Sequence, residues 1–245
     1  MICIIELPTA IQLDSSVMRP NQSDITNGLA RIPLFRVLPA AELHLLAARC
    51  EAHRFPKGEA LFKEGERAVA VWVIQRGWVH LLKHTPYGAT VTVFTVTPEE
   101  VLCGISAAAG AGTYYASAVA ATETLATRIP QDAVTSLIAH QPGFAEQVLL
   151  TYHKRMRQMA ESFSLAQAPV EQRLAYVLMR LHATFGKTLP VTHHELAQMA
   201  GTRWETSIRT LSAMKRRGWL TSSRGRVTIV TFKPLRALLS DHRSS

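Results

Sequence analysis

The sequence predicts an α+β fold: an N-terminal antiparallel β-barrel or jelly roll, then one long helix, then a C-terminal winged helix-turn-helix. Three features predict it: β-branched runs of strand length between residues 54 and 129, an apolar stripe at helical spacing after residue 142, and two helix-start signals after residue 189. The expected parts are a flexible N-terminal extension (1–28), a β-barrel domain (29–140), a long helix (141–168) and a winged helix-turn-helix domain (169–245).

Short strands and turns alternate through the first half of the chain. The run at 90–96, TVTVFTV, is typical of the β-branched segments, and turn signals such as Pro56-Lys57-Gly58 separate them at intervals of about ten residues. This spacing is typical of an antiparallel barrel or jelly roll. Before these strands, Leu43 and Leu46 follow Pro39 at helical spacing and predict a short helix.

The segment after Pro142 predicts a long helix with one apolar stripe, which ends before Pro169. Phe144 begins the stripe, and its further members recur every three or four residues: Val148, Tyr152, Met156, Met159 and Phe163. The stripe can pack against the chain's own β-domain, or it can pair with the same helix of a second copy across a dimer axis. The second alternative predicts a homodimer.

Composition excludes several classes of protein. No apolar run approaches the ~18 residues that cross a bilayer, and the N-terminus lacks the basic start and cleavage site of a secretory signal, so a cytoplasmic protein is expected. The three cysteines, Cys3, Cys50 and Cys103, are widely separated. This pattern argues against a disulfide framework, a zinc knuckle or a cluster held by four thiolates.

The positive charge of the chain is concentrated at its C-terminal end. Residues 169–245 contain 13 Lys or Arg and 4 Asp or Glu, a net charge of +9, whereas residues 1–168 contain 14 of each kind. Local positive charge is rewarded by a polyanion, because neutralised phosphates release counterions. The alternative, a basic patch that binds a membrane surface, lacks an amphipathic anchor. We therefore expect double-stranded DNA, and no membrane, as a partner.

Two helix-start signals lie ten residues apart in this basic segment. In Thr192-His193-His194-Glu195 and again in Thr202-Arg203-Trp204-Glu205, a threonine and a glutamate three residues later form a predicted capping box. Gly201 between them suits a tight turn. The pattern predicts a helix-turn-helix in which Ile208, Leu211 and Met214 of the second helix face inward.

The start of the second helix carries side chains that can read base edges in a major groove. Arg209 can make two bonds to a guanine, Glu205 can accept from a cytosine amino group, and the basic run 215–217 suits phosphates. Two short strands follow, joined by a turn with arginines at its tip. The candidate DNA contacts are Thr192, Thr202, Arg203, Trp204, Glu205, Thr206, Arg209, Lys215, Arg216, Arg224 and Arg226.

The order of a barrel, a long helix and then HELAQMAG, ETSIRTLSAMKRRGWL and SRGRVTI resembles the Crp-Fnr superfamily of dimeric bacterial transcription regulators, over Arg31 to Phe232. The resemblance implies an eight-stranded cyclic-nucleotide-binding-type barrel that senses an effector, a dimerisation helix and a winged helix that binds an inverted repeat. RNA polymerase is an expected partner if the protein is an activator. Trp204 stands where the cyclic-AMP branch has a base-reading arginine, and Ile208 where many members have serine or glycine, so an atypical operator is expected.

The same resemblance bears on the effector. The family's cyclic-AMP site uses a Gly-Glu pair and an Arg-Ser pair, where this chain has Gly104-Ile105 and Tyr114-Tyr115, so cyclic AMP is not expected. The iron-sulfur branch needs clustered cysteines that are absent here. Cys103 lies close to the cysteine ligand of the haem-containing members, and Tyr114-Tyr115 resembles the nitric-oxide-responsive branch. Haem or gas sensing, a redox switch, another small ligand and no ligand remain open, with Cys103, Gly104, Ile105, Tyr114 and Tyr115 as the candidate residues.

A different class, a cupin-type metal enzyme with an appended basic domain, is the main alternative. Cupin chemistry uses a His-x-His pair together with a downstream glutamate and histidine on a metal ion. The sequence contains no His-x-His and no visible pairing of a nucleophile with a base. We therefore expect a protein that is not an enzyme.

Overall fold

The computed structural model describes residues 22–84, 90–102 and 112–240. The chain divides into two compact units, Met1–Arg155 and Met156–Ser245. Each unit has its own buried core, and each is considered separately below.

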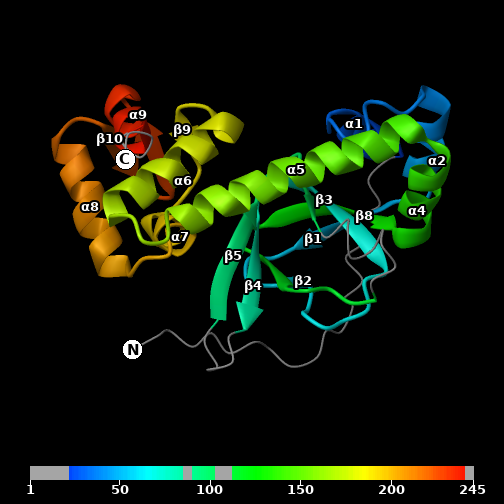
Figure 1. The fold of residues 1–245 in the computed structure, drawn as a ribbon, viewed down its shortest axis with the longest axis horizontal. Helices are drawn as coiled ribbons and strands as arrows, with labels where there is room; N and C mark the ends of the chain where they lie inside the picture. The colour runs from blue at the N-terminus through cyan, green and yellow to red at the C-terminus, as the bar shows by residue number, and fades with distance from the viewer. Residues whose placement is uncertain (1–21, 85–89, 103–111, 241–245) are drawn as a thin grey trace. The chain divides into compact units, whose positions relative to one another are not determined.

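The N-terminal unit is built on two antiparallel sheets (Figure 1). One sheet has the order β1-β8-β3-β6 and the other the order β2-β7-β4-β5. The strands are β1 (Glu51–Phe55), β2 (Ala60–Phe62), β3 (Ala70–Arg76), β4 (Val79–His84), β5 (Thr90–Val96), β6 (Val101–Leu102), β7 (Ser117–Ala120) and β8 (Thr124–Pro130). The predicted α+β fold is confirmed, but within the described residues the sheets do not close into one barrel. Among the described residues, no strand of one sheet pairs with a strand of the other.

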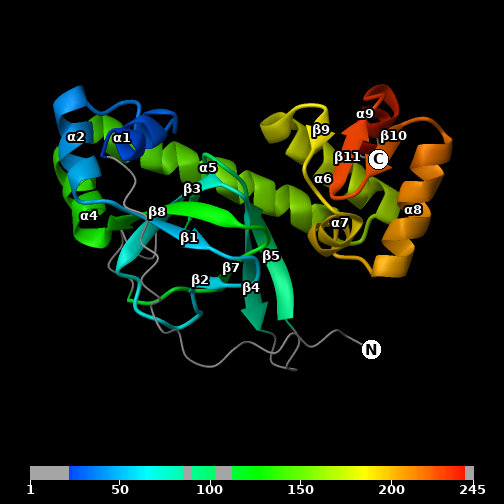
Figure 2. The same cartoon turned by 180° about the vertical axis from the view of Figure 1, so that it is seen from behind.

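The helices of this unit are α1 (Gln22–Ala30), α2 (Ala40–Ala48), α4 (Gln131–His140) and the start of α5 (Pro142–Ser164), and the first three gather at one end of the sheets (Figures 1 and 2). The short helix expected after Pro39 is α2. The flexible extension predicted for residues 1–28 is wrong for residues 22–28, because they form most of α1. Ile25 and Leu29 lie four apart on one face of α1 and are buried in the core of this unit. Residues 1–21 of that predicted extension lie outside the described residues.

Helix α5 confirms the long helix predicted after Pro142, and its apolar stripe has two kinds of environment. Phe144 is buried with its ring centroid 5.8 Å from that of Phe35, and Val148 packs against the same core. Farther along, Met156 and Phe163 are exposed, with 70% and 83% of their surface accessible. The first part of the stripe therefore packs within its own unit, and the rest does not.

The C-terminal unit contains helices α6 (Val170–Phe185), α7 (His193–Met199), α8 (Trp204–Arg216) and α9 (Lys233–Ser240). Its sheet has the order β10-β11-β9, with β9 (Thr188–Leu189), β10 (Leu220–Ser223) and β11 (Arg226–Ile229) (Figure 2). Leu174, Leu178, Leu196 and Met214 are fully buried and join α6, α7 and α8 around one core. The predicted helix-turn-helix and the two-stranded wing are both confirmed. No helix among the described residues is long and apolar enough to span a membrane.

Candidate nucleic-acid interface

Helix α7 begins with the first of the two predicted capping boxes. The Thr192 hydroxyl accepts a hydrogen bond from the Glu195 amide at 3.2 Å, and the Glu195 carboxylate accepts one from the Thr192 amide at 2.7 Å. The same hydroxyl also donates to the carboxylate at 2.7 Å. Glu195 is buried, so this network lies inside the unit. Thr192 caps α7, and its contact with DNA stays a prediction.

The second predicted capping box is wrong. Helix α8 begins at Trp204 with Arg203 as its N-cap residue, and no side chain caps it. Thr202 instead helps to close the preceding helix: its amide donates to the Ala197 carbonyl at 3.0 Å, while the Gly201 amide donates to the Gln198 carbonyl at 3.1 Å. Gly201 has φ +57°, which glycine adopts without steric cost. These two bonds form a Schellman motif that ends α7. The motif includes Thr202, the residue that the sequence pattern predicted as the N-cap of α8.

We expect Thr192→Ala to destabilise the C-terminal unit by about 0.5–2 kcal/mol, because it removes the capping hydroxyl. The matched change Thr202→Ala should destabilise the unit clearly less, because the Thr202 hydroxyl does not cap α8. Urea unfolding followed by circular dichroism measures both free energies. Equal losses for the two variants would contradict the assignment of the cap to Thr192 alone.

Helix α8 has one buried and one exposed face. Ser207, Leu211 and Met214 are buried, whereas the predicted inward residue Ile208 is only half-buried. Most of the DNA-contact candidates on α8 and its N-cap are exposed, and Thr206 is half-buried: Arg203, Trp204, Glu205, Thr206, Arg209, Lys215 and Arg216. The start of the helix therefore presents polar and aromatic groups to the surroundings, as a helix that reads base edges requires.

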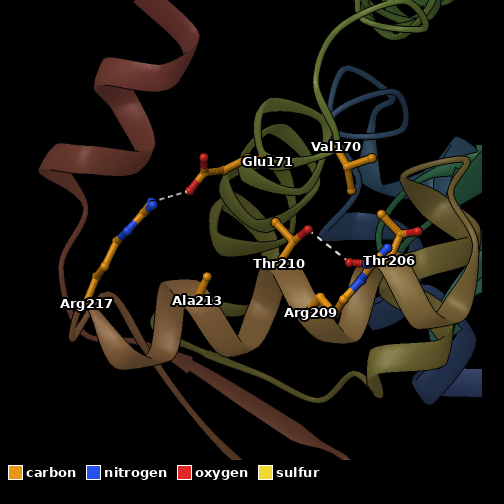
Figure 3. A pocket seen from close by; sticks show the side chains of 7 residues that line it. All are labelled: Val170, Glu171, Thr206, Arg209, Thr210, Ala213 and Arg217. Atoms are coloured by element: carbon orange, nitrogen blue, oxygen red, sulfur yellow. Dashed lines mark hydrogen bonds and ion pairs between the residues drawn. The ribbon is translucent and has the colours of Figure 1, made fainter.

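A shallow groove of about 430 Å³ runs between this helix and the start of α6 (Figure 3). Thr206 and Arg209 lie toward one end of the groove, and Arg217 lies toward the other. Arg217 pairs with Glu171 of α6 at 2.6 Å, and its guanidinium carbon lies 5.0 Å from the centroid of the Trp219 ring. Of the basic run 215–217, Arg217 is thus held by its own unit, while Lys215 and Arg216 make no ion pair with any residue that the structure describes.

The wing is a hairpin whose two strands pair from Leu220 with Ile229 to Ser223 with Arg226. Arg224 and Gly225 form its turn, and Gly225 has φ +68°, which favours glycine at this position. Arg224 and Arg226 are both exposed at the tip. The predicted basic tip of the wing is therefore present in the structure.

Two histidines lie beside the exposed start of α8. The ring centroid of His194 is 5.6 Å from that of Trp204, with the planes tilted by 60°. Partial burial lowers the pKa of the neighbouring His193, and the Lys215 ammonium lowers this pKa further. Both effects disfavour the protonated imidazole of His193, so this residue carries less positive charge than an unperturbed histidine would.

In the N-terminal unit, Tyr114 and Tyr115 have different surroundings, and the other effector candidates, Cys103, Gly104 and Ile105, lie outside the described residues. Tyr114 is buried, stacks on Phe62 with 3.8 Å between ring centroids, and donates its hydroxyl to the Ala70 carbonyl at 3.0 Å. Tyr115 is exposed. Tyr114 is thus a core residue.

Arg155 of α5 is a further candidate for the effector site, and the sequence reasoning missed it. Its guanidinium carbon lies 3.9 Å from the centroid of the Phe94 ring, and its Nη2 donates to the Val101 carbonyl at 3.3 Å. Its Nη1 is buried and has no hydrogen-bond partner among residues 22–84, 90–102 and 112–240. A basic residue within an amphipathic helix normally indicates solvent exposure, so nothing in the sequence distinguished Arg155 from its basic neighbours.

Comparison with known families decides the identity of both units. The family model for the cyclic nucleotide-binding domain matches residues 52–141, and the model for the Crp-like helix-turn-helix domain matches residues 172–238. The chain belongs to the Crp-Fnr family. This Crp-Fnr protein is a DNA-binding transcription regulator, as the matched helix-turn-helix and the relatives below agree.

The regulator is 29% identical over 201 residues to the CRP-like cAMP-activated global transcriptional regulator of Mycobacterium tuberculosis, covering 78% of this chain and 89% of that protein. It is 29% identical over 199 residues to the cyclic AMP receptor protein of Thermus thermophilus, covering 80% and 92%. Its fold is similar to that of FixK2 from Bradyrhizobium japonicum, with a TM-score of 0.69 and 17% identity over 77% of this chain and 96% of FixK2. The mycobacterial relative is a transcriptional regulator, and none of the three supports the cupin-type alternative.

Within the part of the chain that the structure describes, no three His, Cys, Asp or Glu side chains gather as a metal site would require.

Proposed function

We propose that this regulator binds an inverted repeat in double-stranded DNA as a homodimer, with α8 of each copy reading base edges. The observation that carries the proposal is the exposed start of α8, where Trp204, Glu205 and Arg209 are all exposed, while Leu211 and Met214 of the same helix are buried in the core of the unit. Lys215, Arg216 and the wing arginines are exposed on the same unit and suit phosphate contacts. RNA polymerase would be a further partner if the regulator is an activator.

Helix α5 supports the dimer. Five of its apolar residues that are not buried follow the spacing three, four, three, four that two paired helices require: Leu149, Tyr152, Met156, Met159 and Phe163. Leu149 is 71% exposed and takes the place predicted for Val148, which packs against its own core. Large apolar side chains in a regular row on one helix are costly in water. A second copy of α5 would cover them.

Selection of bound duplexes from a random pool tests the proposal directly. We expect an inverted repeat whose half-sites lie about 34 Å apart, and sedimentation should give a species of twice 27.1 kDa. Affinity for the selected duplex should fall steeply as salt is raised, because bound phosphates release counterions. A monomer that binds one half-site as tightly as the full repeat would contradict the proposal.

For the effector, we propose that cyclic AMP is not the signal and that any haem or redox response runs through Cys103. The names of two relatives contain cyclic AMP. This chain, however, has Tyr114 and Tyr115 where the family's Arg-Ser pair holds the cyclic phosphate. The buried Nη1 of Arg155 favours an effector that carries an acceptor group. The propionates of haem would supply such a group, and so would other anions.

Absorbance spectra after haem supplementation test this part. If the wild type binds haem and shows a Soret band, this band should shift or disappear in Cys103→Ser, because a thiolate ligand changes the electronic state of the iron. DNA binding should not respond to cyclic AMP in either protein. A band that is identical in both proteins would exclude Cys103 as a ligand, and no band in the wild type would exclude haem.

A further inference from the structure

We infer that Arg173 of α6 is a positioning residue that sets the orientation of α8 by clamping the turn of the helix-turn-helix. Its Nη1 donates to two consecutive carbonyl oxygens, that of Ala200 at 3.0 Å and that of Gly201 at 2.7 Å. Both carbonyls belong to the turn between α7 and α8. The inference rests on the proposed DNA reading by α8 and assigns to Arg173 a role in its specificity.

The clamp matters because, among the described residues, no side chain caps the start of α8. Arg203, its N-cap residue, makes no capping hydrogen bond, and the Schellman motif at Gly201 uses only backbone groups. Carbonyl groups at the end of a helix and in the following turn lack partners within the helix. A charged donor makes stronger bonds to such carbonyls than a neutral donor does. One guanidinium therefore joins the end of α7 to the residues that lead into Trp204.

The base of the clamp is rigid. Leu174, adjacent to Arg173, and Leu178, one turn later, have no exposed surface, so the backbone of α6 is fixed in the core of the unit. The guanidinium also lies close against the turn: a Cβ added to Gly201 would be 3.6 Å from Nη1 of Arg173, an ordinary contact distance. Two hydrogen bonds from a fixed helix thus restrain where α8 begins and which way its first residues face.

This geometry separates Arg173 from a residue that binds phosphate. Loss of a direct phosphate contact weakens binding to every duplex. It also reduces the slope of log affinity against log salt concentration by about one. A positioning residue changes only the binding that depends on aligned base contacts. Loss of the clamp should therefore reduce specificity and leave non-specific affinity and its salt slope unchanged.

Fluorescence anisotropy with the selected operator and a random duplex tests the inference. We expect Arg173→Ala to lower operator affinity by about 10- to 100-fold, comparable to the loss of one well-placed base contact, and to change random-duplex affinity by less than about twofold. Arg236→Ala, which removes the same charge from the exposed surface of α9, is the matched control and should preserve the ratio of the two affinities. Equal losses on both duplexes, or a salt slope reduced by about one, would overturn the positioning role.

Two further measurements keep the inference testable if Arg173→Ala folds poorly. Arg173→Lys keeps the charge but replaces the planar guanidinium, so its specificity should lie between those of Arg173→Ala and the wild type. Wild-type specificity in Arg173→Lys would show that a positive charge is enough at this position, and would overturn the role assigned to the two guanidinium hydrogen bonds. Amide hydrogen exchange of the free wild type and variants should show faster exchange at residues 201–204 when the clamp is lost, with the core of α6 unchanged. This readout needs no DNA, so failure of the clamp is distinguishable from failure of the proposed function.

Discussion

Replacing Met156 and Phe163 together by glutamate is expected to convert the proposed dimer into monomers and to lower affinity for the proposed inverted repeat by about 100- to 10,000-fold. Both side chains are largely exposed on α5, and they occupy equivalent positions seven residues apart in its apolar row. Glutamates at these positions would place like charges on opposite sides of a dimer axis in an apolar interface. Each monomer would then hold only one half-site and lose the gain from binding two sites together.

Leu150→Glu provides a matched control for this double variant. Leu150 is also exposed on α5, but it lies outside the row defined by Leu149, Tyr152, Met156, Met159 and Phe163. Sedimentation of this control should still give a dimer with wild-type affinity. If the double variant stays dimeric, or if Leu150→Glu also dissociates, the dimer uses a different surface of the protein.

Arg209→Ala should cost about 1–3 kcal/mol of binding free energy on the selected operator, and a change of one base pair in the operator should remove that difference. Arg209 is exposed near the start of α8, where a side chain with two parallel donors can meet the O6 and N7 atoms of a guanine. The comparison variant is Lys215→Ala, on the last turn of the same helix. Its loss should be similar on all duplexes and should reduce the salt slope by about one.

Competition binding against operators that differ at one base pair separates the two roles. Arg209→Ala should flatten the preference at one position in each half-site and preserve the others. Lys215→Ala should preserve the preference at every position. A uniform loss across all operators in Arg209→Ala would place this residue on the phosphate backbone instead.

The helix-turn-helix could be predicted because its signals are local. A capping residue, an apolar period and a glycine turn each depend on residues within one or two helical turns, and α7 begins where Thr192 and Glu195 indicated. The same local rule was wrong at Thr202. Two motifs compete for this residue, and the bonds that close α7 use its amide, which a pattern of side chains does not reveal.

Features that depend on distant residues could not be predicted. Val148 and Leu149 are adjacent apolar residues, and only the packing of α5 against its own core shows that the first is covered and the second is exposed. Arg173, Arg217 and Arg155 are similar in sequence, since each is an arginine in or next to a helix. Their partners lie 28, 46 and 54 residues away, so the fold alone distinguishes a clamp on a turn, an ion pair and a buried guanidinium.

The ion pair between Glu171 and Arg217 also shapes how the regulator approaches DNA. It cancels the charge of Arg217 locally, so the positive charge that lines the groove comes from Arg209, and Lys215, Arg216 and the wing arginines add exposed positive charge to the same unit. Unpaired surface charges attract a polyanion from a distance of about one Debye length, roughly 8 Å at physiological ionic strength. Electrostatic steering by these side chains should raise the association rate with DNA, and the rate should fall as salt screens them.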